Sequence, residues 1–217
     1  DFIYSVPLSV YVINENKQDS KVFVGKGTTI GQTRQDRQRK FDKRFLLGFE
    51  KVYVFSEEYA AQGINTGIDI LFNNQFVNDT GFVCVCKGKS EDILKMKLEG
   101  YPSAADFIDG LIRSSSGYNF FPKNYKILDM YVRIDSEGRC AVIPYIEVID
   151  NEIQITGVAV FERDRMAFKL NMEDSKLLNI LKEENINGML SIQSGTKDYI
   201  DFYVKSSRKV SCYKEGD

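Results

Sequence analysis

The stretch FEKVYVFSEEYAAQG, residues 49–63, passes from an apolar run into a helix start within a few residues. The run 49–55 is apolar except for Glu50 and Lys51, and it is short enough to be a buried strand. Ser56 precedes two glutamates and the run 59–61, a pattern typical of a helix N-cap and first turn. Since a strand followed directly by a helix is the building unit of α/β layers, this stretch predicts such a layer around itself.

The residues before this stretch predict a hairpin and a helix. Apolar runs at 10–13 and 21–24 are separated by a polar segment, which favours two paired strands. The polar segment 30–45 follows two threonines, Thr28 and Thr29, and either can cap a helix.

After the central stretch we expect a second helix over 66–76 and a strand over 82–86. Residues 1–90 are therefore expected to form a small α/β N-terminal subdomain.

The pattern changes beyond residue 90. Residues 91–190 predict short helices, two of them preceded by prolines, then strands over 139–145, 153–162 and 166–170. A further helix over 173–183 is expected to bury Leu177, Leu178 and Leu181.

The expected fold class is α+β, with a helix-rich second subdomain that contains antiparallel strands. The β-prone tail 191–217 is expected to begin a further domain that this chain does not contain.

Composition excludes several classes of enzyme. The 217 residues contain no histidine, which removes Ser-His-Asp and Cys-His nucleophiles and every His-ligated metal site. The net charge of −2 gives no overall field that attracts nucleic acid. No apolar run approaches the roughly 18 residues of a membrane-spanning helix. We therefore expect no enzyme, no cofactor and no nucleic-acid partner.

The four cysteines predict buried thiols and no metal site. Cys84 and Cys86 share one face of an expected strand, and Cys140 and Cys212 lie far along the chain. This spacing lacks the two close Cys-x-x-Cys pairs of a zinc ribbon.

A glycine run offers an alternative function. Gly25, Gly27 and Gly31 follow an expected strand and open an expected helix, the context in which helix N-termini bind phosphate. The spacing has one residue too many for the dinucleotide fingerprint. The alternatives are a small-molecule or nucleotide binding module that uses this turn, and a glycine turn with a threonine cap.

The helix expected over 30–45 is rich in basic residues. Arg37, Lys40 and Arg44 are spaced by three and four residues and would share one face. Each such charge could contribute about 1 kcal/mol near an anionic membrane. The candidate membrane or partner contacts are Arg34, Arg37, Lys40 and Arg44, against the alternative of an ordinary solvated helix.

Four blocks, in order, resemble the Ger(x)C family of spore germination proteins. They are GTTIG at 27–31, GFEKVYVFSEEYAAQG at 48–63, VCVCKGKSEDIL at 83–94 and ITGVAVFERDRMAFKL at 155–170. The chain departs from the family pattern where Gln32 and Thr33 replace a Glu-Ala pair. The resemblance covers nearly the whole chain.

This resemblance implies a non-catalytic, lipoprotein-type C subunit of a nutrient germinant receptor. It implies a peripheral, lipid-anchored location at the extracytoplasmic side of the spore inner membrane, with membrane-integrated receptor subunits as partners. The lipid anchor would lie upstream of this chain. The resemblance implies no catalytic, cofactor-binding or metal-binding residues.

Overall fold

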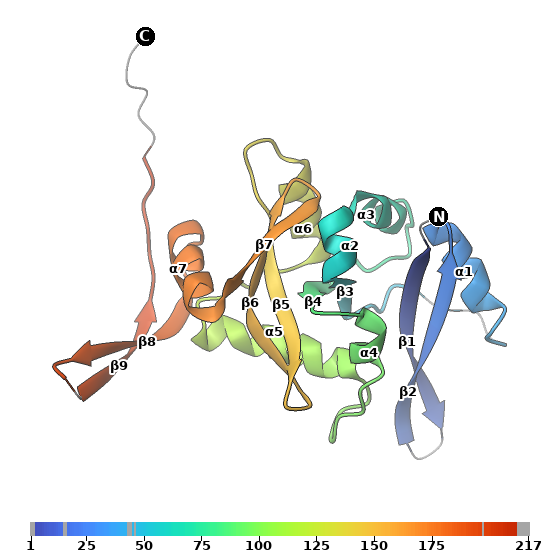
Figure 1. The fold of residues 1–217 in the computed structure, drawn as a ribbon, viewed down its shortest axis with the longest axis horizontal. Helices are drawn as coiled ribbons and strands as arrows, with labels where there is room; N and C mark the ends of the chain where they lie inside the picture. Colours follow the sequence, from blue (N-terminus) through green and yellow to red (C-terminus); the bar gives the residue numbers. More distant parts are fainter. Residues whose placement is uncertain (1–2, 15–16, 43–44, 46, 197, 212–217) are drawn as a thin grey trace, which may run out of the picture.

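The computed structural model describes all residues except 1–2, 15–16, 43–44, 46, 197 and 212–217 (Figure 1). The described elements form three sheets and seven helices, so the α+β class is confirmed. Within the described residues, no helix is both long enough and apolar enough to cross a membrane.

The chain begins with the predicted hairpin, which is longer than the two apolar runs suggest. Strand β1 (Tyr4–Asn14) pairs antiparallel with β2 (Lys17–Gly27), from Tyr4 opposite Gly27 to Asn14 opposite Lys17. Helix α1 (Ile30–Gln38) then packs on β2. The hairpin and α1 form a layer at one end of the molecule (Figure 1).

Helix α1 is shorter than the predicted helix 30–45. It ends at Gln38 with Arg39 as its C-cap, and two aromatic side chains beyond the helix end lie near the hairpin. Phe41 and Phe45 lie 4.6 and 5.9 Å from Phe23, centroid to centroid, and stack on each other at 4.9 Å.

The centre of the molecule is a five-stranded sheet in the order β3-β4-β5-β6-β7. Strands β3 and β4 come from residues 1–90 and the other three from 91–190, so the two predicted subdomain segments contribute to one sheet. Its strands are β3 (Val52–Ser56), β4 (Phe82–Cys86), β5 (Val142–Ile149), β6 (Glu152–Glu162) and β7 (Arg165–Asn171). The β3–β4 and β4–β5 pairs are parallel, and the β5–β6 and β6–β7 pairs are antiparallel.

Helices cover this sheet and close the core. The predicted cap at Ser56 is confirmed, since its hydroxyl accepts from the Tyr59 amide, and Ser103 caps α5 in the same way. The helices are α2 (Glu57–Gln62), α3 (Asn65–Phe72), α4 (Ser90–Leu94), α5 (Ala104–Tyr118), α6 (Ile127–Asp135) and α7 (Met172–Lys182). All five residues of β4 are buried, so this strand is the centre of the core.

The prediction for α7 is wrong about which face is buried. Leu177 and Leu181 are 58% and 71% exposed, and only Leu178 packs against the core. Ser175 and Asn179 are buried instead. They are polar, but their side chains are satisfied there: the Ser175 hydroxyl donates to the backbone of the preceding turn, and Asn179 meets a buried tyrosine hydroxyl.

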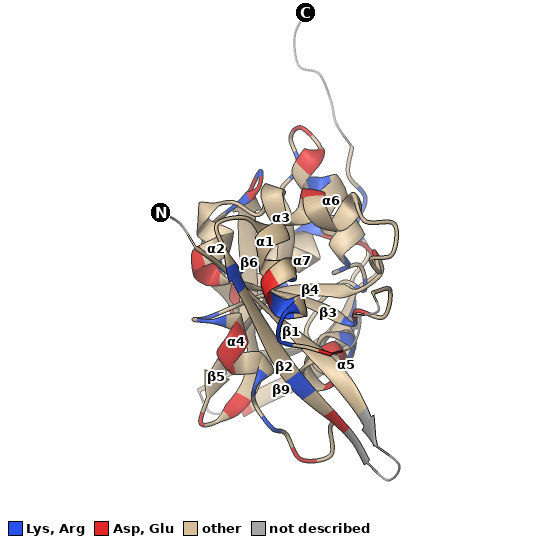
Figure 2. Cartoon of the chain, turned by 90° about the vertical axis from the view of Figure 1, so that its right-hand side faces the viewer, with Lys and Arg blue, Asp and Glu red and all other residues tan. Residues whose placement is uncertain are grey.

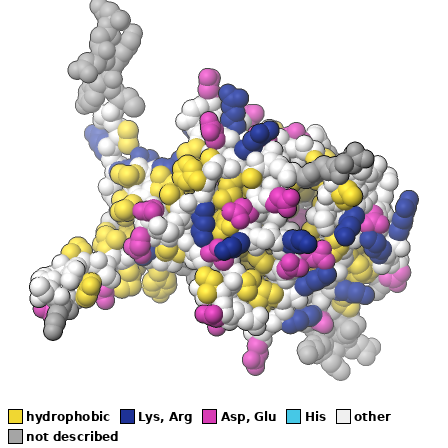
Figure 3. All heavy atoms as spheres, viewed as in Figure 1, with side chains coloured by type: hydrophobic (Ala, Val, Ile, Leu, Met, Phe, Trp, Pro, Cys, Tyr) yellow, Lys and Arg dark blue, Asp and Glu magenta, His cyan; other side chains and the backbone are white. Residues whose placement is uncertain are grey.

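The tail forms a separate two-stranded sheet. Strand β8 (Asn187–Ser194) pairs with β9 (Asp198–Lys205) and joins the body through a bridge between Asn119 and Gly188. Hydrophobic side chains gather on the surface of this part of the molecule (Figure 3). Its exposed apolar residues include Ile192, Tyr199, Ile200 and Tyr203.

Candidate functional site

The glycine turn is filled by protein atoms. A Cβ at Gly25 would stand 1.9 Å from the Thr33 carbonyl oxygen, and one at Gly27 would stand 2.6 Å from Gln32 Cβ. Both glycines therefore let α1 approach β2 more closely than any side chain permits. Gly31 faces open space, with its nearest neighbour at 3.8 Å.

The N-terminus of α1 is capped by its own residues. The Thr29 hydroxyl accepts from the Gln32 amide. The Gln32 side-chain oxygen accepts from both the amide and the hydroxyl of Thr28. This reciprocal arrangement resembles a capping box and occupies donors that a phosphate would need.

The four basic candidates do not share one surface. Arg37 is only 9% exposed, and its Nη1 donates to the Val6 carbonyl at 2.9 Å and to the Thr33 hydroxyl at 3.3 Å. Burial, followed by the charge of Arg34, lowers the pKa of Arg37. This side chain ties α1 to β1, which is a structural role.

Arg34 and Lys40 are exposed, and Arg44 lies outside the described residues. The Lys40 ammonium pairs with Asp36 at 2.6 Å and donates to the Val24 carbonyl at 3.0 Å. Basic positions lie along β2 and beside α1 in Figure 2. The exposed cations of this surface are Lys21, Lys26, Arg34, Arg39 and Lys40, and its described carboxylates are the exposed Asp19 and Asp42 and the half-buried Asp36.

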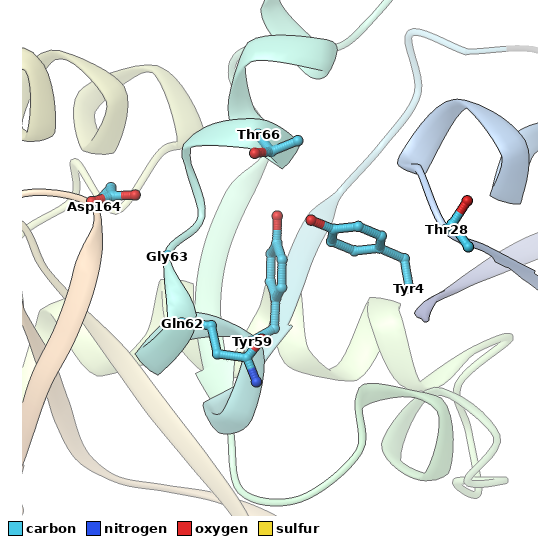
Figure 4. Close-up of a pocket in the computed structure, with 7 residues that line it drawn as sticks. All are labelled: Tyr4, Thr28, Tyr59, Gln62, Gly63, Thr66 and Asp164. Atoms are coloured by element: carbon cyan, nitrogen blue, oxygen red, sulfur yellow. The ribbon is translucent and has the colours of Figure 1, made fainter. Parts of the chain in front are cut away.

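A cavity of about 500 Å³ opens between the hairpin end before α1, helices α2 and α3, and the β6–β7 turn. The Tyr59 hydroxyl points towards Thr66, and the Tyr4 hydroxyl points towards Tyr59 (Figure 4). The complete lining set is Tyr4, Thr28, Tyr59, Gln62, Gly63, Thr66 and Asp164.

Tyr59 also supports the adjacent helix. Its hydroxyl accepts from the Gly67 amide at 3.1 Å, and α3 has no side-chain cap of its own. Burial raises the pKa of Tyr59 to about 12, with smaller contributions from Tyr4 and Asp164, so the phenol stays protonated. Tyr59 therefore offers a neutral ring and hydroxyl to the cavity.

Sequence reasoning did not identify this cavity. Asp164 enters it from the β6–β7 turn, about a hundred residues beyond Tyr59, and its carbonyl accepts from the Ile64 amide at 3.0 Å. Such a meeting of distant segments leaves no local pattern. The one sequence feature that lies at the cavity is the glycine-rich turn, because Thr28, which follows Gly27, lines one wall.

The described cysteines form no disulfide, and the two thiols on β4 are buried. Burial raises the pKa of the Cys84 thiol, and that of Cys86 to about 12, so both stay protonated and unreactive. Cys140 is half-buried, and Cys212 lies outside the described residues. Within the described part of the chain, no group of three or more Cys, Asp or Glu side chains is placed to hold a metal ion.

Two family models match the chain in succession. The model described as "Spore germination protein N-terminal domain" matches residues 4–148. The model described as "Spore germination B3/ GerAC like, C-terminal" matches residues 156–217.

Curated relatives agree with these matches. The chain is 21% identical over 165 residues to "Spore germination protein GerQC" of Bacillus cereus, covering 76% of this chain and 46% of the relative. It is 24% identical over 179 residues to "Putative spore germination protein YfkR" of Bacillus subtilis (strain 168), covering 76% of this chain and 41% of that protein. The chain thus spans less than half the length of these relatives.

Among solved structures, "Crystal Structure of the GerBC protein" is similar over 93% of this chain and 63% of that chain, with 9% identity and a TM-score of 0.48. The family assignment rests on the sequence models, which together span most of the residues from 4 to 217. The chain belongs to the Ger(x)C family of spore germination proteins.

Proposed function

We propose that this chain is part of a non-catalytic C subunit of a nutrient germinant receptor, required for the response of spores to nutrients. The observation that carries this proposal is the succession of two spore germination models over residues 4–148 and 156–217. Both curated relatives carry spore germination names, which supports the same role.

The composition supports a role without catalysis. The chain has no histidine, and several carboxylates are held in ion pairs, as between Glu147 and Lys169 at 2.8 Å. A carboxylate held in this way by cations is a poor general base at neutral pH, because its pKa is depressed. We therefore assign these charges to stabilisation of the fold.

The proposed location is the extracytoplasmic side of the spore inner membrane, with a lipid anchor upstream of Asp1 and membrane-integrated receptor subunits as partners. The exposed cations around α1 support an approach to an anionic surface. In this proposal Arg34, Lys40 and Arg44 make contact, and Arg37 holds α1 on the hairpin through its bond to the Val6 carbonyl.

A gene deletion in the native spore former tests the role. Spores without the full-length protein are expected to lose germination in response to at least one class of nutrient. Restoring the full-length gene is expected to restore that response. Unchanged germination with every nutrient that the parent strain answers would contradict the proposal.

A further inference from the structure

We propose that the cavity lined by Tyr59, Thr66 and Asp164 binds a small organic ammonium ion that carries a hydroxyl group. This site goes beyond the receptor-subunit role proposed above, because it gives the chain a ligand of its own. The inference comes from the charge, the aromatic surface and the polar groups of the cavity.

The charge of the lining favours a cation. Asp164 is the single ionisable acid or base among the lining side chains apart from the two tyrosines, and no lysine or arginine lines the cavity. A phosphate or a carboxylate would meet a negative charge without a cation to pair with. An ammonium ion would meet an attractive charge instead.

The Asp164 carboxylate has no partner among the described residues. Arg163 and Arg165 flank it in sequence, yet neither forms an ion pair with it within the described chain. A Cβ at Gly63 would stand 2.7 Å from Asp164 Oδ2, so the carboxylate lies directly against the glycine backbone. Gly63, with a φ of 120°, keeps this wall free of a side chain.

The aromatic wall favours an ammonium over a metal cation. The rings of Tyr4 and Tyr59 meet edge to face, with 6.1 Å between centroids and an interplanar angle of 77°, and together they form an aromatic wall. An organic ammonium is attracted to the face of such a ring by the ring's quadrupole. The charge of Asp164 contributes to the raised pKa of Tyr59, which places both groups in one electrostatic environment.

The remaining lining groups are neutral and hydrogen-bonding. Thr28, Gln62 and Thr66 offer hydroxyl and amide groups. These groups can form hydrogen bonds with a hydroxyl on the ligand, but they carry no charge that would balance a second charge on it. A cavity of about 500 Å³ falls within the range typical of small-molecule sites.

The position of the cavity connects two parts of the fold. Tyr4 and Thr28 belong to the N-terminal hairpin and the turn before α1, whereas Asp164 belongs to the β6–β7 turn (Figure 4). A bound ammonium ion would contact both sides and stabilise their arrangement. Occupancy is therefore expected to slow amide exchange in α1 and α2.

Tyrosine ring signals in NMR spectra of the full chain test the site. Titration with ethanolammonium is expected to shift the signals of Tyr4 and Tyr59 with a millimolar Kd. Ethylene glycol and glycolate, which match its size but carry no charge or a negative charge, are expected to leave these signals unchanged. Equal shifts with all three compounds, or no shift with ethanolammonium, would overturn the proposal.

Matched variants make the test specific. Asp164→Asn keeps the backbone carbonyl that bonds Ile64 and is expected to raise the Kd about tenfold or more. Asp164→Glu, which keeps the charge, is expected to bind within a few-fold of the parent. Asp198→Asn, at an exposed acid on β9, is the control and is expected to bind normally. Parent-like binding by folded Asp164→Asn would refute the site and leave the receptor-subunit role untouched.

Discussion

Single residues decide how α1 meets the hairpin. Because Gly25 has no side chain, the Thr33 carbonyl can lie against β2. Arg37 donates a hydrogen bond to the Val6 carbonyl on β1. From the sequence, Gly25 was a candidate for ligand binding and Arg37 for membrane or partner contact. In the fold, close packing accounts for both of them.

The first prediction concerns this close approach. Gly25→Ala is expected to destabilise the protein by more than about 2 kcal/mol, because the new Cβ would overlap a backbone oxygen that cannot move cheaply. The exposed α5 residue Gly110, with nothing within 4 Å of an added Cβ, is the control. Gly110→Ala is expected to stabilise by about 1 kcal/mol. Chemical denaturation measures both, and similar values for the two variants would contradict the packing argument.

The second prediction concerns pH. Burial raises the pKa of Glu147, but the ammonium groups of Lys169 and Lys87 outweigh this and lower it to about 2. A depressed pKa gives stability that is present above the unfolded-state pKa, near 4.3, and is lost as the pH falls towards 2. Glu147→Gln is expected to remove this part of the acid sensitivity.

Denaturant unfolding at pH 7 and at pH 3 tests this expectation. The loss of stability between the two values should be smaller in Glu147→Gln than in the parent. The exposed Glu152→Gln, on the neighbouring strand, should behave like the parent. An identical pH dependence in all three proteins would show that Glu147 contributes nothing.

These residue-level features differ in how far sequence reveals them. The Ser56 cap was predictable because it depends on residues three positions away. The burial of Arg37 was not, since its partner Val6 is 31 residues away in the chain. Local patterns report local hydrogen bonds, and a basic residue that packs inwards has the same pattern as a solvated one.

At the scale of elements, hydrophobic periodicity failed where polar residues form the buried face. Helix α7 faces the core with Ser175 and Asn179, because its Asn171 cap and the bond to Tyr125 orient that side inwards. Leucines at 177 and 181 were expected to be buried on periodicity alone. The predicted strands 82–86, 153–162 and 166–170 agree with β4, β6 and β7 to within one residue, whereas the strand predicted over 139–145 lies at Val142–Ile149.

The third prediction tests this orientation of α7. Asn179→Ala is expected to cost about 1–3 kcal/mol, because it leaves the fully buried Tyr125 hydroxyl without its partner. Leu181→Gln is expected to change stability by less than about 0.5 kcal/mol, since Leu181 is exposed. A larger cost for Leu181→Gln than for Asn179→Ala would mean that α7 lies on its other face.

The candidate site shows a similar limit. Its residues come from β1, the turn before α1, α2, α3 and the β6–β7 turn, and each is unremarkable in its own segment. By contrast, the basic residues between positions 30 and 45 were recognised from the sequence. The helix was expected to continue to residue 45, whereas α1 ends at Gln38, so the predicted common face is not formed.

At the scale of the whole molecule, the central sheet joins residues from both halves of the chain, with the hairpin layer at one end and the β8–β9 sheet at the other (Figure 1). The family assignment covers both halves. It was predictable from sequence because four blocks occur in order, although none of them is specific alone.

The fourth prediction concerns the basic surface as a whole. Reversal of Arg34, Lys40 and Arg44 to Glu is expected to weaken binding to acidic liposomes at least about tenfold, since each cation near such a surface contributes about 1 kcal/mol. The difference should shrink at high salt. The control reverses three exposed lysines elsewhere, Lys89, Lys123 and Lys205, and should bind more tightly than the first variant. Equal binding of the two variants would contradict a specific contact surface.

The most direct test of the central claim is co-purification from spores. The full-length protein carries an affinity tag, spore membranes are solubilised gently, and the proteins that remain bound are identified by mass spectrometry. The account predicts recovery of membrane-integrated germinant receptor subunits together with the tagged protein. Recovery of the tagged protein in the soluble fraction, without those subunits, would contradict it.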